Sequence, residues 1–126
     1  MTVALLLHRA DGALPSTSFR QAAFGTADPF ARDREIAWEG PGAMSAGRIS
    51  FIGEVNVGHY PHTETIVVME GTISLITADA AEGAPLVLRR GEGAVIARGT
   101  ALRIQAAARS LFVFCAAAAE DRKSVV

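Results

Sequence analysis

The stretch VGHYPHTETIVVMEG, residues 57–71, decides the fold of this 126-residue chain. It places two imidazoles and one carboxylate close together, at His59, His62 and Glu64. Pro61 separates the two histidines, and an apolar strand that ends in Gly71 follows the carboxylate. Titratable side chains gathered beside a buried strand are typical of a functional site.

The residues before this stretch alternate with period two, which is typical of a half-buried strand. Ile49, Phe51 and Val57 fall on the apolar face, and the same parity extends that face to His59. Glycines and an alanine-rich link separate further short strands, which we expect over residues 64–70, 72–75, 86–88, 94–96, 102–105 and 111–115. Strands at about ten-residue spacing with glycines between them predict an all-β sandwich or barrel.

The N-terminal third lacks a sustained helical stripe and is rich in Gly, Pro, Ser and Thr. A strand is expected over residues 3–7, followed by a long arm that Phe19, Phe24 and Phe30 attach to an apolar surface. We therefore divide the chain into a strand and arm over residues 1–36, a barrel over residues 37–118 and a tail over residues 119–126.

The strand expected over residues 111–115 is apolar on both faces, although antiparallel sheets usually leave one face in water. Its cover comes either from the arm or from a second subunit, so we expect a homodimer. Cys115, the only cysteine, lies in this strand and forms no internal disulfide. We expect it to be a buried, inert thiol.

The amino-acid composition indicates which classes of binding partner to expect. The formal net charge is −1, so the chain lacks the basic footprint of a nucleic-acid-binding protein, and we expect no membrane-surface role. The apolar run over residues 3–7 is shorter than the core of a secretory signal and is closed by His8 and Arg9. The sequence therefore predicts a cytoplasmic protein.

The central stretch allows two interpretations. His62 and Glu64 share a strand face, and Pro61 turns the chain so that His59 can face them. Two imidazoles and a carboxylate suit a divalent metal such as catalytic zinc or non-haem iron, with His59, His62 and Glu64 as ligands. Alternatively, His59 and Glu64 form a hydrogen-bonded pair inside the barrel while His62 lies at its solvated mouth.

His59, four residues, Glu64, six residues and Gly71 resemble the first motif of the cupin superfamily of small β-barrels. Residues 91–100, GEGAVIARGT, resemble the second motif, with Ala97 where proline is usual. The resemblance covers residues 48–116 and implies an all-β, cupin-like jelly-roll β-barrel with an N-terminal arm. The surrounding pattern is most similar to single-domain cupins grouped with ureidoglycine aminohydrolase and the ethanolamine-utilisation cupins.

The resemblance also implies a degenerate metal site. Most metal-binding cupins use three histidines and one glutamate, but Val57 and Leu102 stand at two of the histidine positions. Ile104 stands where the similar cupins often have tryptophan. The expected cofactor is therefore none, or a weakly bound divalent metal held by His59, His62 and Glu64.

The first functional hypothesis is a small cupin that binds a small polar metabolite in its barrel. His59 and Glu64 are then the polar anchors and the candidates for general acid and base, and Tyr60, His62 and Trp38 are candidate ligand contacts. The second is a metal-dependent aminohydrolase- or isomerase-like enzyme acting on a small nitrogenous or carboxylated metabolite. The third is a non-catalytic dimeric assembly module.

Overall fold

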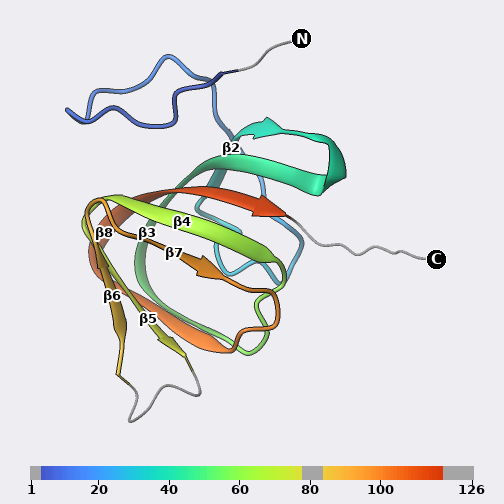
Figure 1. Ribbon diagram of the computed structural model, residues 1–126, viewed down its shortest axis with the longest axis vertical. Helices are drawn as coiled ribbons and strands as arrows, with labels where there is room; N and C mark the ends of the chain where they lie inside the picture. The colour runs from blue at the N-terminus through green and yellow to red at the C-terminus, as the bar shows by residue number, and fades with distance from the viewer. Residues whose placement is uncertain (1–3, 78–83, 118–126) are drawn as a thin grey trace.

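The structure is a computed structural model that describes residues 4–77 and 84–117, and every described regular element apart from one 3₁₀ turn is a β-strand. The eight strands form one antiparallel sheet that curls into a jelly-roll barrel (Figure 1). In chain order they are β1 Arg20–Gln21, β2 Arg34–Glu39, β3 Met44–Val57, β4 Thr63–Glu70, β5 Thr72–Thr77, β6 Leu86–Arg89, β7 Gly93–Ile96 and β8 Leu102–Ala117; the turn η1 is Pro41–Ala43. The all-β prediction is confirmed.

β8 is the central strand of the sheet. It pairs with β3 along most of its length, with β4 through its second half and with β5 over Leu102 to Gln105. The sequence predicted two strands here with an alanine-rich link between them, but the 16 residues from Leu102 to Ala117 form one strand. The alanine-rich link lies opposite a register shift in the pairing with β3, between Phe51 and Gly53. Such an irregularity bends a strand without ending it.

Gly71 makes the tight connection from β4 to β5. Its φ of 87° is in the left-handed region, and a Cβ at this position would lie 2.4 Å from Ser110 Oγ. Glycine is required here for both reasons. The two strands expected on either side of Gly71 are therefore joined by a turn at this single residue.

The strand predicted over residues 3–7 is wrong for its described part, since residues 4–7 have irregular backbone. Figure 1 shows this segment beyond the barrel, above β2 in that view, and no described strand pairs with it. The tail predicted over residues 119–126 lies outside the described residues.

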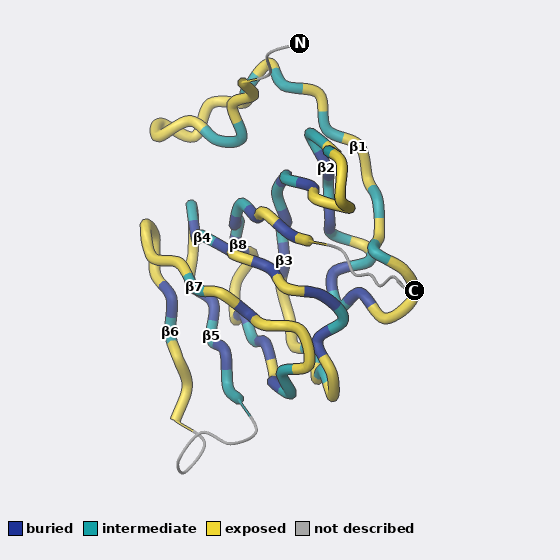
Figure 2. Tube along the Cα trace, turned by 45° about the vertical axis from the view of Figure 1, so that its right-hand side comes forward, coloured by how far each residue is buried: buried dark blue, intermediate teal, exposed yellow. Residues whose placement is uncertain are grey.

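The core lies between the inward faces of the curved sheet (Figure 2). The period-two pattern of β3 is confirmed, because Ile49 and Phe51 are buried whereas Ile52 is 48% exposed. The inward face of β8 is buried in the same way, and it contributes Ile104, Phe112 and Phe114. Alternate burial along both long strands gives the barrel one continuous apolar interior.

Residues 22–33 form a loop that packs into this interior. The ring of Phe30 is fully buried, and its centroid lies 5.3 Å from the ring centroids of Phe51 and Phe112. Phe24 packs edge to face against Phe114, and Phe19 lies under the guanidinium of Arg48. The predicted attachment to an apolar surface is present for Phe24 and Phe30, whereas Phe19 packs against the cation of Arg48.

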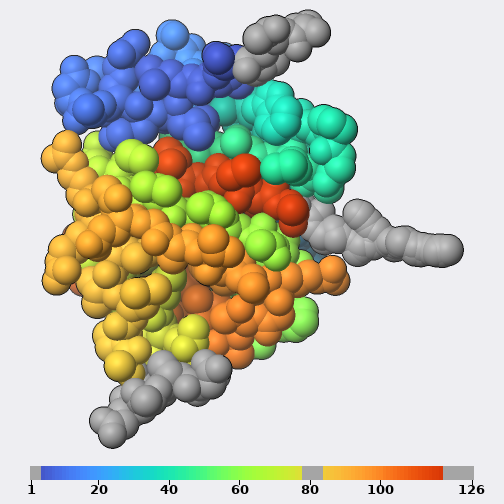
Figure 3. Space-filling model, viewed as in Figure 1, coloured from blue at the N-terminus to red at the C-terminus, as the bar shows by residue number. Residues whose placement is uncertain are grey.

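The outward face of β8 is less covered than the sequence indicated. Leu111 and Val113 are half-buried and Cys115 is exposed, so the expectation of a buried thiol is wrong for this chain by itself. Figure 3 shows this face of β8 between β4 and the β2–β3 region, with the N-terminal segment lying along its upper border. The arm packs into the interior through its aromatic rings and leaves this outer face to solvent.

Within the described residues, no helix is long and apolar enough to cross a membrane. The cytoplasmic location stays a prediction from the sequence.

Candidate functional site

A buried arginine is the centre of the polar site. Arg34 is the first residue of β2 and points into the barrel, where its side chain is 0% exposed. The Arg34 guanidinium carbon lies 4.0 Å from the ring centroid of Phe24 and 4.5 Å from that of Phe114. Stacking on aromatic faces suits a weakly hydrated planar cation, but a buried charge also needs counterions.

One counterion comes from the loop. Arg34 Nε donates to Asp28 Oδ2 at 2.8 Å, and Nη2 donates to Oδ1 at 3.0 Å. The same carboxylate accepts the backbone N–H groups of Phe24 and Phe30 at 2.9 and 3.0 Å. Asp28 therefore fixes the turn of the loop and fastens it to Arg34 through a two-point, charge-assisted contact.

The other counterion is the motif carboxylate, Glu64 on β4. Arg34 Nη1 donates to Glu64 Oε2 at 2.6 Å and Nη2 donates to Oε1 at 3.1 Å. Oε1 also accepts the Tyr60 hydroxyl at 2.6 Å and lies 2.9 Å from His62 Nε2. Glu64 is thus surrounded by three donor side chains, and the whole group is closed to solvent.

The charges hold one another ionised. Burial alone raises the pKa of Glu64, but the hydrogen bonds of His62 and Arg34 and the charge of Arg34 outweigh it, so that the pKa is lowered. The pKa of Asp28 is lowered in the same way, with burial opposed by Arg34. Burial lowers the pKa of Arg34, and its two carboxylate partners raise it above its ordinary value. Burial and the neighbouring Glu64 charge raise the pKa of Tyr60, which stays a neutral donor.

His62 is the least satisfied member of the group. Its side chain is 1% exposed, and its short contact to Glu64 assigns Nε2 as the proton donor. Nδ1 has no hydrogen-bond partner in the described part of the chain, and the ring packs edge to face with Phe24, with the ring centroids 4.9 Å apart. The expectation that His62 lies at a solvated mouth is wrong, because loop residues 22–33 cover it.

The expected pairing of His59 with Glu64 is also wrong. β3 ends at Val57, so the strand parity no longer applies at His59, and the imidazole is exposed beside Gly99. Tyr60 instead occupies the inward position next to Glu64. The carboxylate does have the partner that its burial demands, but that partner is Arg34.

The metal set His59, His62 and Glu64 does not fit this arrangement. His59 is outside the barrel, and both oxygens of Glu64 accept hydrogen bonds from Arg34. Across residues 4–77 and 84–117, no three His, Cys, Asp or Glu side chains are arranged to hold a metal ion as they stand. The proposed ligands are therefore not assembled.

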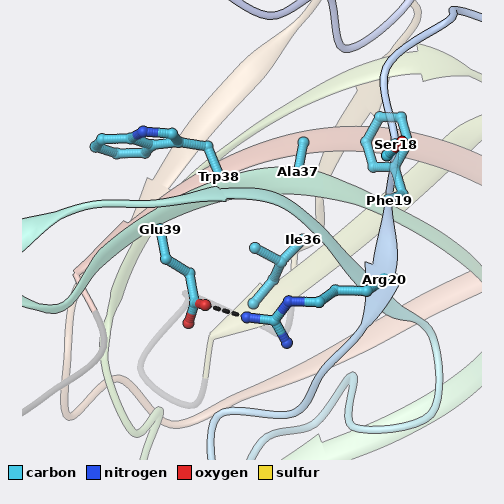
Figure 4. A pocket seen from close by; sticks show the side chains of 7 residues that line it. All are labelled: Ser18, Phe19, Arg20, Ile36, Ala37, Trp38 and Glu39. Atoms are coloured by element: carbon cyan, nitrogen blue, oxygen red, sulfur yellow. Dashed lines mark hydrogen bonds and ion pairs between the residues drawn. The ribbon is translucent and has the colours of Figure 1, made fainter. Parts of the chain in front are cut away.

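Trp38 is separate from this group. Its ring lies over the outer side of β2, where the strand and residues 18–20 border a crevice of about 170 Å³ (Figure 4). The Arg20–Glu39 ion pair crosses the crevice (Figure 4). Trp38 also lines a second hollow with Leu5 and Leu7. It lies beside the arm and does not line the cavities at the start of β8.

Two cavities, each larger than this crevice, lie beside the start of β8. Leu102 and Thr77 line both of them. One, of about 420 Å³, is bordered by Asn56, Val57, Gly58, Ile76, Thr77, Ala101, Leu102 and Arg103. The other, of about 340 Å³, is bordered by Leu75, Thr77, Ala84, Leu86, Ala94, Val95, Ile96, Ala97, Thr100 and Leu102. Val57 and Leu102, which replace two histidines of the family motif, thus face open space with apolar side chains.

Arg34 and Asp28 were missed by reasoning from the sequence. Arg34 is 30 positions from Glu64 and belongs to no motif, so its spacing carries no signal. One indication was present: Arg34 and Ile36 share parity in a strand, which puts an arginine on the buried face. A buried carboxylate at Glu64 requires a cation, and this arginine is a candidate on that ground.

Comparisons with known structures identify the fold. A protein of unknown function of the DUF861 family from Pseudomonas syringae superposes with a TM-score of 0.82 at 36% identity, over 90% of this chain and 47% of that chain. A cupin-2 domain protein from Shewanella frigidimarina superposes with a TM-score of 0.54 at 24% identity, over 66% of this chain and 76% of that chain. A putative ethanolamine utilization protein Q from Salmonella typhimurium superposes with a TM-score of 0.52 at 19% identity, over 62% of this chain and 60% of that chain. No family model and no curated protein matches the sequence.

The chain has the cupin fold, as the two motifs predicted. Among the solved structures, it is similar to the DUF861 protein over nearly all of its own residues, and it spans about half the length of that protein. The expected likeness to ethanolamine-utilisation cupins is confirmed at the level of the fold.

Proposed function

We propose that this chain is a small-molecule-binding cupin whose ligand lies in the paired cavities around Leu102 and Thr77. The proposal rests on the position of the open space in the barrel. Glu64 is paired with Arg34, whereas apolar side chains border a cavity at the positions where the family motif has histidines. Cavities of a few hundred Å³ with apolar walls and a few polar groups are typical of small-ligand sites. Neither cavity is lined by Tyr60, His62 or Glu64.

The lining favours a ligand with an apolar body and an acidic end. Val57, Ile76 and Leu102 supply apolar walls, and Arg103 is the cation at the border of the larger cavity. Among residues 4–77 and 84–117, the ion pair of Arg103 is a long one, 3.9 Å from its Nε to Glu54 Oε2, so a ligand carboxylate can compete for it. A small monocarboxylate with an alkyl or aryl group matches this lining.

The test is a titration of isotope-labelled protein with hexanoate and with benzoate, in which binding is monitored through the amide chemical shifts. We expect the largest shifts at Thr77, Ala101 and Leu102, and weaker binding of hexanol and benzyl alcohol, which lack the charge. Arg103→Gln should lower the affinity for both carboxylates by about tenfold, because one charge-assisted contact is lost. Arg109→Gln is the matched control, because Arg109 is an exposed arginine of the same strand that donates to Ser50.

Equal effects of the two arginine substitutions, or shifts confined to residues outside the cavities, would overturn this assignment. The alternative of a metal-dependent enzyme is less well supported, because the motif carboxylate is closed off and paired. Within the proposed function, His59 is an exposed residue of the 58–62 connection and not an anchor for the ligand.

A further inference from the structure

The inference concerns the buried charges and does not depend on which ligand the cavities hold. One nitrogen of Arg34, Nη2, lies among ligand-type atoms of three residues. It is 3.0 Å from Asp28 Oδ1, 3.1 Å from Glu64 Oε1 and 3.5 Å from His62 Nε2. Two carboxylates and an imidazole around one point are a donor set for a divalent transition metal, with the cation supplied by an arginine.

We infer that the Arg34 guanidinium takes the place of a metal ion, so that Asp28, His62 and Glu64 form a latent divalent-metal site that the chain fills with its own side chain. Two carboxylates match the charge of one divalent ion, whereas Arg34 supplies a single positive charge. His62 would bind the metal through Nε2 with its proton moved to Nδ1, for which the described residues provide no partner. Zinc–ligand distances are about 2.0–2.2 Å, so the three side chains would need to close in by roughly 1 Å. They stand too far apart to hold a metal while Arg34 separates them.

Arg34 also explains why the loop belongs to the site. A metal bound only by motif residues would leave residues 22–33 without a polar attachment, whereas the guanidinium binds Glu64 on one edge and Asp28 on another. Phe24 then covers the face of the cation, at 4.0 Å. The substitution of an arginine for a metal therefore joins the loop to the barrel in the same contact.

The test removes the guanidinium and offers a metal. Arg34→Met and the parent, both carrying His59→Ala to delete the exposed imidazole, are purified with a chelator, dialysed and titrated with Zn²⁺ and Co²⁺. We expect Arg34→Met to bind one metal ion per chain, with a visible Co²⁺ spectrum and a rise in Tm of roughly 5–10 °C at about 100 times the Kd. The parent should show neither change.

Two further variants make the result specific. Arg34→Lys retains a cation between the carboxylates and should bind at least tenfold more weakly than Arg34→Met. Asp28→Asn added to Arg34→Met removes one proposed ligand and should reduce affinity at least tenfold. Equal binding by the parent and Arg34→Met, or an unchanged affinity on adding Asp28→Asn, would overturn the inference.

Arg34→Met leaves two buried carboxylates and can fail to fold without metal. In that case the titration becomes a refolding experiment on Arg34→Met and on Arg34→Ser, whose smaller side chain leaves room for water around the carboxylates. Recovery of soluble, folded protein by Zn²⁺ but not by Mg²⁺ supports the latent site, because Mg²⁺ prefers oxygen ligands and retains its waters. Failure of Zn²⁺ to restore either variant contradicts it.

Discussion

At the scale of single residues, the important distinction is between the two polar residues of the first motif. Glu64 is fully buried and receives hydrogen bonds from Arg34, Tyr60 and His62, whereas His59 is exposed. Removing one member of a buried ion pair leaves the other charge uncompensated, which is much more costly than changing a solvated side chain. The two residues that the family motif treats alike should therefore behave very differently.

We predict that Glu64→Ala lowers the free energy of unfolding by about 3–5 kcal/mol. His59→Ala should change it by less than about 0.5 kcal/mol, as expected for a surface position. Urea denaturation followed by circular dichroism measures both values. If His59→Ala costs as much as Glu64→Ala, the exposed placement of His59 is incorrect.

At the scale of elements, the loop over residues 22–33 depends on a carboxylate. The pKa of Asp28 is lowered from its ordinary value of 3.8, because Arg34 and two backbone N–H groups outweigh the effect of burial. A carboxylate with a lowered folded-state pKa contributes stability in full above its unfolded-state pKa. That contribution is lost as the pH falls through the lower, folded-state value.

We therefore predict that the contribution of Asp28 to stability is constant from pH 7 down to about pH 5 and decreases below pH 3.8, the ordinary pKa of its carboxyl group. Asp28→Asn should be less stable than the parent at neutral pH by about 2–3 kcal/mol and should lose less stability in acid. Glu64 keeps part of the acid dependence in both proteins, since its pKa is lowered as well. Denaturation curves at several pH values test this, and parallel curves for the two proteins would contradict it.

The elements also show what the sequence could and could not predict. Strand parity placed Ile49 and Phe51 inside and Ile52 outside, because alternation is a local property of an extended chain. The same parity failed at His59, where the strand had already ended at Val57. The contacts of Arg34 with Glu64 and Asp28 depend on which strands become neighbours, and no local pattern reports that.

At the scale of the whole molecule, the outer face of the β3–β8–β4 region presents apolar side chains that are only partly covered. Val113 and Leu111 are half-buried there and Cys115 is exposed, with Ala46 and Thr65 opposite Cys115 on the neighbouring strands. Half-covered apolar side chains on a sheet face favour association. This is the same strand whose two apolar faces led us to expect a homodimer.

We predict a homodimer that uses this face, with a solution mass of twice the 13.2 kDa of the chain. Val113→Arg should give a folded monomer, because a charge on the outward face opposes burial against a second copy. Val95→Arg on β7 is the control, since Val95 is 65% exposed and lies on another strand. Light scattering measures the mass, and a monomeric parent would contradict the prediction.

The central position of β8 has a consequence for synthesis on the ribosome. β3, β4 and β5 each find a hydrogen-bonding neighbour in β8, which follows them in the sequence by 25 residues or more, counting from Thr77 to Leu102. The growing polypeptide must therefore carry three apolar strands outside the exit tunnel before residues 102–117 emerge to join them. Contacts this distant in sequence form slowly, and exposed strand edges invite aggregation in the interval. Nascent chains of this protein stalled before residue 102 should be captured by chaperones, and chains stalled well beyond residue 117 should not.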